Sequence, residues 1–502
     1  MLDNLALGFE TAFTISNLLY CLIGVTLGTA IGVLPGVGPI VTISVLLPLT
    51  FGLPPEGALI MLSGIYYGAQ YGGSTTAILV NLPGESSSVV TCIDGYQMAR
   101  QGRAGAALAV AAIGSLVAGC IGTLLLAFFA PLLTSVALDL SAPEYCSLMF
   151  LSLCCTASLV PSALLKGLVM ALTGVLFGMV GTDVYSGLSR FTFGVPGLGD
   201  GIDFVIVAMG MFAFSEIISN LVDPEERKLL TTRVEGLMIR LEDLKESWKS
   251  MLRGAGVGSL LGIIPGAGVS VASFVAYVVE KKIARDPSRF GNGAIEGVAG
   301  PEAANNGAAQ ASFIPTLSLG IPGSPTMALI LGALMIQGIT PGPDVVTSHP
   351  KLFWGLVVSM LIGNVLLVLL NLPLIGVWIR MLKVPYRWLY PGILVFSCVG
   401  ILTINMNPLD VALAALFGLV GYIFVKLDYP PAPFILGFVL GPMIEENLRR
   451  ALLFSEGSYS IFVTRPISAF FLVLTALLFV SILVQILKGG ERAVAIGGRS
   501  EP

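Results

Sequence analysis

The sequence predicts an all-α polytopic membrane protein built from two inverted repeats, each with a re-entrant helical hairpin and a broken helix. Of its 502 residues 55% are hydrophobic and 11% are charged, whereas soluble proteins contain about 25% charged residues. The mean hydropathy of +0.91 excludes an ordinary soluble enzyme, whose exposed apolar surface would aggregate. The 60 Gly and 30 Pro are too many for uninterrupted spanning helices and indicate close packing and deliberate breaks.

Uninterrupted apolar segments account for most of the expected helices, and most are long enough to cross about 30 Å of hydrocarbon. They lie at about 105–133, 144–160, 167–182, 203–222, 352–379, 388–404, 409–425, 431–444 and 466–487. Two further apolar stretches, 16–99 and 254–341, are interrupted by Gly, Pro, Ser, Thr and Asn. The charged segment 223–253 has apolar residues at helical spacing, which predicts an amphipathic arm on the cytoplasmic membrane surface. A solvated linker is the alternative.

The chain repeats itself in order. GVLPGVG at 32–38 resembles GIIPGAG at 262–268, and residues 67–84 align with 306–323. LFGMVG at 176–181 matches LFGLVG at 416–421, and FSE at 214–216 recurs at 454–456. Because the offsets of 230, 239, 240 and 240 residues are nearly constant, we predict a duplication. The first repeat spans 1–222, the second spans 254–456, and an extra C-terminal helix and tail occupy 457–502.

The basic residues favour inversion of the two copies. Arg253 precedes the segment 254–280, and Lys281 and Lys282 follow it. A re-entrant hairpin keeps all three in the cytoplasm, where basic loops concentrate. The first hairpin, about 16–52, has no Lys or Arg at its flanks, so we expect it to enter from outside. With an odd number of crossings per copy, the repeats are inverted, as in many secondary transporters.

Four paired breaks are the expected substrate site, because transporters bind substrate near the midplane at discontinuous helices. A half-helix N-terminus offers unpaired N–H groups to a carboxylate, and glycine lets the backbone approach a ligand closely. The broken helices are expected at about 57–99 and 305–340. The expected substrate contacts are Pro35, Gly36, Gly38, Asn81, Pro83, Gly84, Ser86, Ser87, Pro265, Gly266, Gly268, Pro322, Gly323, Ser324 and Thr326.

Small polar residues beside the breaks suit Na⁺, a hard cation that favours oxygen ligands. The expected shell comprises Ser74, Thr75, Thr76, Asn305, Asn306, Ser312 and Thr316, with Ser318 nearby. The alternative is that these residues only join helices and that the Pro-Gly pairs only kink them. Glu85 is a candidate buried acid for ion binding or proton coupling, with an exposed loop acid as the alternative. Glu296, Glu302, Glu445 and Glu446 are expected at the membrane interface.

The breaks contain no clear basic residue, so an anionic substrate would be held by N–H groups, side-chain dipoles and a coupled cation. The net charge of −4 gives no sign of nucleic-acid binding, and no P-loop occurs. Gly197-Leu198-Gly199-Asp200 resembles the GxGD element of intramembrane aspartyl proteases, but Asp200, Asp203 and Asp183 all lie in loop-like sequence. His349, the one histidine, lies in a polar loop. We therefore expect no enzyme and no resident cofactor, with a protease or passive anion channel as alternatives.

Six segments together resemble the large membrane subunit of tripartite tricarboxylate transporters, the TctA family. They are GVLPGVGP, YGAQYGGSTTAILVNLPGESSS, DGYQMARQG, GIIPGAG, PEAANNGAAQASFIPTLSLGIPG and PFILGFVLGPMIEENLRRAL, and the resemblance runs from about residue 8 to 485. It implies a multi-pass importer of tricarboxylates, dicarboxylates or similar organic acids in the bacterial inner membrane. It also implies coupling to Na⁺ or H⁺, a small four-helix membrane subunit and a periplasmic substrate-binding protein. Similarity to other binding-protein-dependent carriers suggests an elevator motion.

Overall fold

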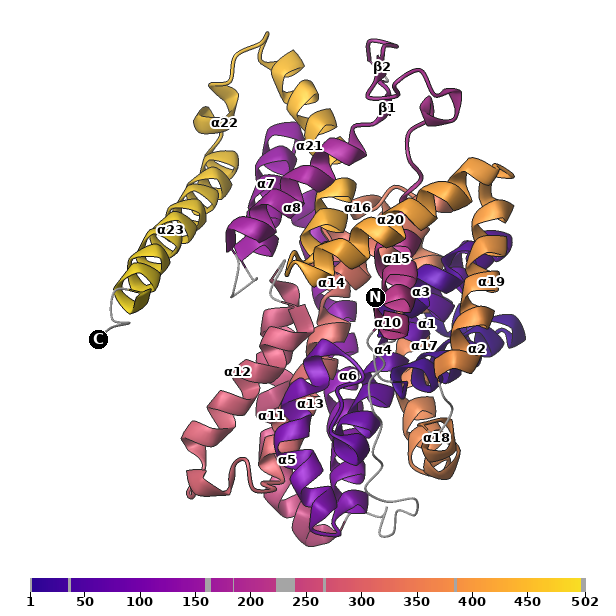
Figure 1. Cartoon of the computed structure of the whole chain (residues 1–502), viewed down its shortest axis with the longest axis vertical. Helices are drawn as coiled ribbons and strands as arrows, with labels where there is room; N and C mark the ends of the chain where they lie inside the picture. The colour runs from indigo at the N-terminus through magenta and orange to yellow at the C-terminus, as the bar shows by residue number, and fades with distance from the viewer. Residues whose placement is uncertain are drawn as a thin grey trace. The chain divides into compact units, whose positions relative to one another are not determined.

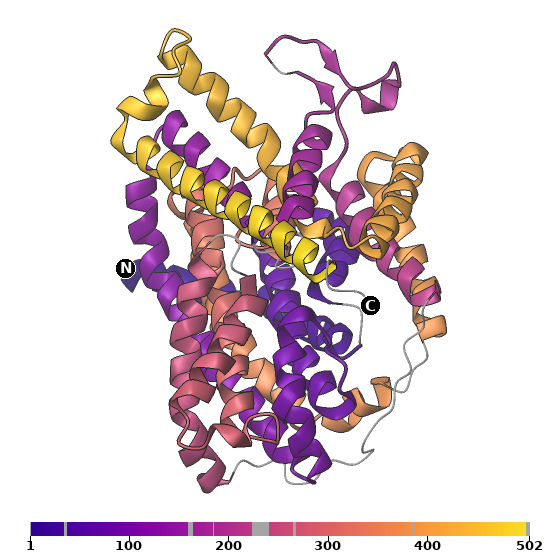
Figure 2. The same cartoon turned by 60° about the vertical axis from the view of Figure 1, so that its left-hand side comes forward.

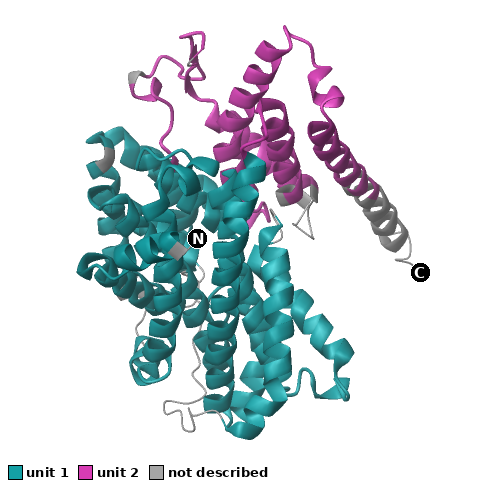
Figure 3. Cartoon of the chain, turned by 180° about the vertical axis from the view of Figure 1, so that it is seen from behind, with its two compact units in different colours: residues 1–137, 205–422 teal, residues 138–204, 423–502 magenta. Residues whose placement is uncertain are grey.

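The computed structural model describes residues 2–34, 38–158, 164–183, 185–222, 240–264, 268–382 and 386–497. These residues are almost entirely helical, which confirms the all-α polytopic membrane class, and they add one small antiparallel sheet at 181–190. Five helical segments among them are long and apolar enough to cross a membrane: Ile15–Gly32, Ala104–Ala137, Phe204–Val222, Pro350–Asn371 and Pro408–Lys426. The chain divides into two compact units, each drawn from both halves of the sequence (Figure 3).

Unit 1 comprises residues 1–137 and 205–422, which include the segments predicted to form the two hairpins and the two broken helices. Its first part holds α1 (Leu2–Ala12), α2 (Ile15–Gly32), α3 (Pro39–Leu46), η1 (Leu47–Gly52), α4 (Pro55–Val80), η2 (Ser86–Ser88), α5 (Val89–Arg100) and α6 (Ala104–Ala137). Its middle part holds α9 (Phe204–Ala208), the π-helical η4 (Met209–Phe214), α10 (Ser215–Val222), α11 (Leu241–Ile263), α12 (Gly268–Ile283), η5 (Pro287–Arg289) and α13 (Glu296–Ala311). The remainder is α14 (Phe313–Leu319), α15 (Pro325–Ile336), α16 (Pro343–Thr347), α17 (Pro350–Asn371), α18 (Ile375–Leu382), α19 (Tyr386–Asn405) and α20 (Pro408–Lys426) (Figure 1).

Unit 2 comprises residues 138–204 and 423–502. Its elements are α7 (Ala142–Ser158), α8 (Leu164–Gly178), β1 (Gly181–Thr182), β2 (Ser189–Arg190), η3 (Pro196–Leu198), α21 (Pro431–Phe454), α22 (Ile461–Thr464) and α23 (Pro466–Gly497). Helix α21 packs against α7 and α8, and α23 packs along α7. The Arg465 guanidinium lies 2.6 Å from the buried Glu144 carboxylate, and the Ser147 and Ser468 hydroxyls lie 2.7 Å apart, so polar contacts also hold α23 to α7.

Two stripes of glycines bring the helices of two pairs in unit 1 into backbone contact. Helix α2 packs on α4 and α11 packs on α13, and α11, α12 and α13 run side by side (Figures 1 and 2). A Cβ added at any glycine of either stripe would lie 2.2–2.5 Å from a backbone oxygen of the partner helix, so only glycine permits this approach. The stripes are Gly24, Gly28 and Gly32 on α2, and Gly254, Gly258 and Gly262 on α11. They keep the offset of 230 residues that relates the two Pro-Gly motifs.

Two expected boundaries differ from the structure, and proline explains one of them. The span predicted at 352–379 is not one helix, because α17 ends at Asn371 and α18 begins at Ile375. Pro373 lies in this turn, where it supplies no N–H and its ring would meet the carbonyl of residue 369 in a continuous helix. The boundary expected after Arg253 falls inside α11, which begins at Leu241. The rest of the expected connecting arm, 223–239, lies outside the described residues.

Candidate functional site

The two later breaks have the same backbone geometry at positions 239 residues apart. Helix α4 ends at Val80, where Asn81 adopts the left-handed conformation with φ 61° and ψ 26°. Helix α14 ends at Leu319, and Gly320 repeats the conformation with φ 71° and ψ 22°. Four residues later, Glu85 and Ser324 are both extended, with φ of −152° and −155°. At each break, one left-handed residue therefore ends the first helix. The residue four positions later is the N-cap of the next helix.

The helix restarts carry different side chains. Ser324 caps α15 by accepting a hydrogen bond from the backbone N–H of Met327 at 3.2 Å. Glu85 occupies the equivalent N-cap of η2 and forms a capping box with Ser88, whose hydroxyl accepts from the Glu85 N–H. A capping carboxylate is stabilised by the first-turn N–H groups. The first break therefore adds an acid where the second has a hydroxyl.

The prediction that Glu302 lies at the interface is wrong. The residue lies in α13 and is fully buried. The Ser74 hydroxyl of α4 donates to Glu302 Oε2 at 2.5 Å, and the Thr91 hydroxyl of α5 donates to Oε1. The physical reason is the composition of α13: its residues from Gly297 to Ala311 are all buried, and most are Gly or Ala, which lets α13 pack closely among its neighbours. No part of Glu302 is exposed, so its carboxylate does not reach water.

Glu85 lies near this carboxylate. Asn305, on α13, donates to Glu85 Oε1 at 3.2 Å, and the Ser87 hydroxyl donates to the same oxygen. Glu85 and Glu302 interact electrostatically. Within the described residues neither forms an ion pair with Lys or Arg. We call this group the acid cluster: Ser74, Glu85, Ser87, Thr91, Glu302 and Asn305.

The acid cluster joins the two halves of the sequence. Its carboxylates come from α13 and from the break after α4, and each accepts a hydrogen bond from the opposite half: Glu302 from Ser74 and Thr91, and Glu85 from Asn305. Glu302 is buried and Glu85 is half-buried, and acids withdrawn from water in a membrane protein are costly and mark ion or substrate pathways. Two like charges without a base nearby need a proton or a cation before both are stable in low dielectric. The geometry therefore fits a site that takes up positive charge during its working cycle.

Both hairpins approach the first break. The closest atoms to a Cβ built at Gly38, on the first hairpin, are the Glu85 Cβ and the Gly84 carbonyl oxygen, both at 4.0 Å. Ser270 of α12, on the second hairpin, lies within 2.7 Å of Ser86 between their hydroxyl oxygens. Gly268 precedes it with a left-handed φ of 66°. The tip residues Pro35, Gly36, Pro265 and Gly266 lie outside the described residues.

The second break is more deeply placed than the first. Pro322, Gly323, Ser324 and Thr326 are buried, whereas Asn81 and Ser86 are exposed and Pro83 is half-buried. The Tyr66 side chain on α4 interacts with Ser312 and Ser324, which ties the second break to the helix that ends at the first. The Thr316 hydroxyl donates to the Ser312 carbonyl at 2.8 Å, one turn before the break.

The expected cation shell does not gather in one place. Ser74 and Asn305 belong to the acid cluster. Thr76 instead donates to the Val33 carbonyl at 2.6 Å, at the end of α2, and the Asn306 amide donates to the Ser115 hydroxyl at 2.7 Å. Ser312 donates to the Ala309 carbonyl and Ser318 donates to the Ile314 carbonyl, which are local helix contacts. Thr75 lines a small cavity that Ser74 also lines.

Two aspartates of the protease alternative, Asp183 and Asp200, have different surroundings. Asp183 accepts a hydrogen bond from Ser186 at 2.6 Å and forms an ion pair with Arg449 at 3.2 Å. Asp200 is exposed in a loop of unit 2. His349 precedes α17 at its N-cap position. An aspartyl dyad needs two carboxyl groups that share a proton, and Asp183 is instead neutralised by arginine.

The matches to known proteins agree with these features. A model of the tripartite tricarboxylate transporter TctA family matches residues 18–436. The chain belongs to the TctA family. It is also 56% identical over 469 residues, 93% of either chain, to an uncharacterized 52.8 kDa protein in the TAR-I ttuC' 3' region of Agrobacterium vitis. A second protein of that organism, in the TAR-II ttuC' 3' region, is 59% identical over 212 residues, which are 42% of this chain and 88% of the relative. No solved structure matches this TctA chain.

Sequence reasoning had located the breaks of this TctA protein but had missed Glu302 and Thr91. The signal for Glu302 was present: it lies three and four residues before Asn305 and Asn306 on one helix face, in a stretch from 290 to 350 without Lys or Arg. A carboxylate among Gly and Ala residues, with amides at helical spacing, indicates burial more strongly than an interfacial position. Thr91 carries no comparable signal, because it is one of many hydroxyl residues in apolar sequence.

Proposed function

We propose that this TctA chain is a secondary active importer of small organic anions, either tricarboxylates or dicarboxylates, coupled to Na⁺ or H⁺. In this proposal it works in the bacterial inner membrane, beside a small four-helix membrane subunit, and receives substrate from a periplasmic binding protein. The observation that carries the proposal is the acid cluster, two carboxylates without a base, next to matching helix breaks in unit 1. Membership of a tricarboxylate transporter family supports the substrate class.

The proposed binding step follows from the local chemistry. N–H groups at the helix restarts after Asn81 and Gly320 attract a carboxylate, and Ser87 and Ser324 add polar contacts there. The substrate anion would meet two negative glutamates unless a cation neutralises them first. Cation binding therefore precedes or accompanies anion binding, and an ion gradient drives import. An elevator motion, in which the hairpins and broken helices move together against a scaffold, remains part of this proposal.

The proposal is tested by uptake in proteoliposomes that contain this chain, its small membrane subunit and the binding protein. Radiolabelled citrate and succinate are the probes, with inward gradients of Na⁺ or protons imposed separately. We expect concentrative uptake that needs the binding protein and at least one gradient. Gly256→Ala serves as the control variant, because no atom lies within 4 Å of the added methyl group. Uptake that equilibrates without any gradient would identify a channel and overturn the proposal.

A further inference from the structure

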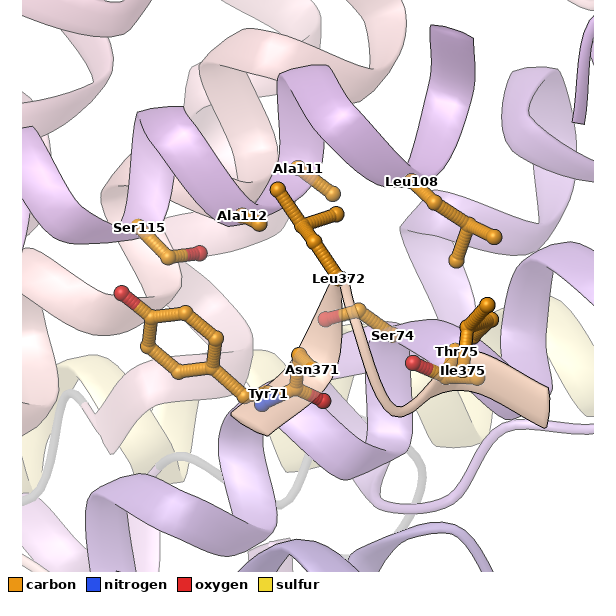
Figure 4. Close-up of a pocket in the computed structure, with 10 residues that line it drawn as sticks. All are labelled: Tyr71, Ser74, Thr75, Leu108, Ala111, Ala112, Ser115, Asn371, Leu372 and Ile375. Atoms are coloured by element: carbon orange, nitrogen blue, oxygen red, sulfur yellow. The ribbon is translucent and has the colours of Figure 1, made fainter. Parts of the chain in front are cut away.

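A small cavity in unit 1 lies between α4, α6 and the turn that joins α17 to α18 (Figure 4). It holds about 10 Å³, which is room for about one water molecule. Five of its lining residues carry an oxygen: Tyr71, Ser74, Thr75, Ser115 and Asn371. Figure 4 shows Ser115 and Tyr71 together at one end, with Leu372 between the side chains of α4 and α6. A cavity of this size with polar walls accepts one small, well-coordinated guest.

Two of these oxygens are buried without a hydrogen-bond partner among the described residues. Tyr71 is 3% exposed and Asn371 is 5% exposed, and neither the Tyr71 hydroxyl nor the Asn371 side-chain oxygen is paired. The Asn371 amide nitrogen donates to the Leu367 carbonyl at 2.9 Å, which leaves its oxygen as the free acceptor. Unpaired buried acceptors are costly, so these groups are explained best by a guest that they bind.

The surroundings favour a cation. Asn371 is the last residue of α17, a 22-residue helix, and a helix C-terminus carries negative partial charge. Ser74 also contacts the Glu302 carboxylate at 2.5 Å, so the cavity lies next to an unneutralised acid. Asn306 already donates to the Ser115 hydroxyl, which orients the lone pairs of that oxygen. The C-terminus of α17 and the Glu302 carboxylate therefore both attract a cation to the cavity.

From these observations we infer that Tyr71, Ser74, Thr75, Ser115 and Asn371 form a binding site for a single Na⁺ ion. Neutral hydroxyl and amide oxygens suit a monovalent cation, whereas Ca²⁺ takes six to eight oxygens with several carboxylates and Mg²⁺ retains bound waters. The cavity has no room for those waters. Bound Na⁺ would offset the Glu302 charge through Ser74. The inference rests on the proposed cation coupling and assigns the ion and its position.

Na⁺ binding is measured on the purified full chain in nanodiscs as the rise in Tm when choline chloride is replaced by NaCl. A ligand that binds the native state raises Tm in a saturable way. Tyr71→Phe and Asn371→Ala each remove one ligand, so the half-saturating Na⁺ concentration should rise about tenfold. Tyr67→Phe and Asn364→Ala are matched controls, because both residues are equally buried on the same helices and neither lines the cavity.

Each result decides between the site and its alternatives. No Na⁺ response in the wild type, an unchanged midpoint in Tyr71→Phe, or an equal change in Tyr67→Phe would overturn the inference. If Asn371→Ala does not fold, Tyr71→Phe still provides the test, because it removes only a hydroxyl. Failure of this site is separable from failure of the proposed function: Na⁺-driven uptake with an unaltered Tyr71→Phe midpoint leaves coupling intact and places the ion elsewhere.

Discussion

Two buried glutamates near α13 have opposite surroundings. Glu280 of α12 is 2% exposed and lies against Gly300. Arg253 donates hydrogen bonds to both of its carboxylate oxygens, at 2.8 and 2.5 Å. Glu302, two residues after Gly300, is fully buried and meets only hydroxyl donors from Ser74 and Thr91. The neutralised acid lies on α12 and the unneutralised acid lies on α13, and both are close to Gly300.

Two other buried acids resemble Glu280, whereas Asp94 is stabilised by three backbone N–H groups and the Tyr277 hydroxyl. Asp243 pairs with Arg103 at 2.9 Å, and Glu144 pairs with Arg465 at 2.6 Å. A buried acid that serves only packing is stabilised by permanent partners, either an opposite charge or several N–H donors, because an unpaired buried charge is strongly destabilising. Glu302 lacks such a partner among the described residues although arginines are used nearby. Glu302 therefore has neither the arginine of Glu280 nor the N–H donors of Asp94, which agrees with the proposed uptake of a cation.

The largest effect is expected from a variant of Glu302. If Glu302 can be replaced without loss of uptake, it does not differ from Glu280 in role. Glu302→Gln keeps the shape and the contacts with Ser74 and Thr91 but removes the charge. We expect citrate uptake to fall up to about a hundredfold, since a charge-assisted contact contributes up to about 3 kcal/mol. The Tm should change little. Initial uptake rates in proteoliposomes measure the effect.

Glu446→Gln is the control for this loss, because Glu446 is exposed and pairs with Arg450 within one helix. Its uptake should equal that of the wild type. Wild-type uptake by Glu302→Gln would show that Glu302 is a structural acid like Glu280, and the distinction between the two would disappear.

Arg253→Met tests the other side of the comparison. It leaves Glu280 buried beside Gly300 without its base, so the free energy of unfolding should fall by about 2 kcal/mol, below the full cost of a broken buried pair because Arg253 is partly exposed. A second change, Glu280→Leu, should restore most of this stability. Thermal unfolding of both variants measures it. A double variant as unstable as Arg253→Met would mean that the pair contributes shape rather than charge compensation.

The sequence predicted helix ends at Asn81 and Gly320 because glycine and asparagine tolerate the left-handed conformation and the prolines that follow cannot continue a helix. Such signals act over a few residues. The turn after Asn371 also carried one, Pro373, but proline is tolerated inside membrane helices, so the apolar run suggested a single span. The burial of Glu302 and its pairing with Ser74 and Thr91 depend on helices far apart in the sequence, and no local pattern encodes that contact.

The two breaks provide a smaller test, because they share backbone geometry but differ at Glu85 and Ser324. Glu85→Gln should lower uptake about tenfold, the loss of one charge-assisted hydrogen bond, since Asn305 still has an oxygen to bind. Ser324→Ala removes a helix cap and should instead lower the free energy of unfolding by about 1 kcal/mol. Uptake rates and Tm of both variants separate the effects. Equal uptake losses in the two would indicate that the breaks have the same chemical role.

The smallest effect is expected in unit 2, where an acid is paired outside the membrane-spanning segments. The hydrogen bond from Ser186, together with the Tyr185 N–H and Arg449, lowers the pKa of Asp183 below its usual value, against the opposing effect of burial. The folded state therefore binds this proton less readily than the unfolded state. Its contribution to stability is complete above about pH 3.9, the usual pKa of an aspartate, and disappears as the pH falls through the lowered value. Tm measured from pH 6 to pH 3 should fall less steeply in Asp183→Asn than in the wild type, and identical slopes would show that the contacts of Asp183 do not stabilise its carboxylate. Because the group is permanently paired, this variant should leave the Na⁺ dependence of uptake unchanged, which is the property that separates it from Glu302.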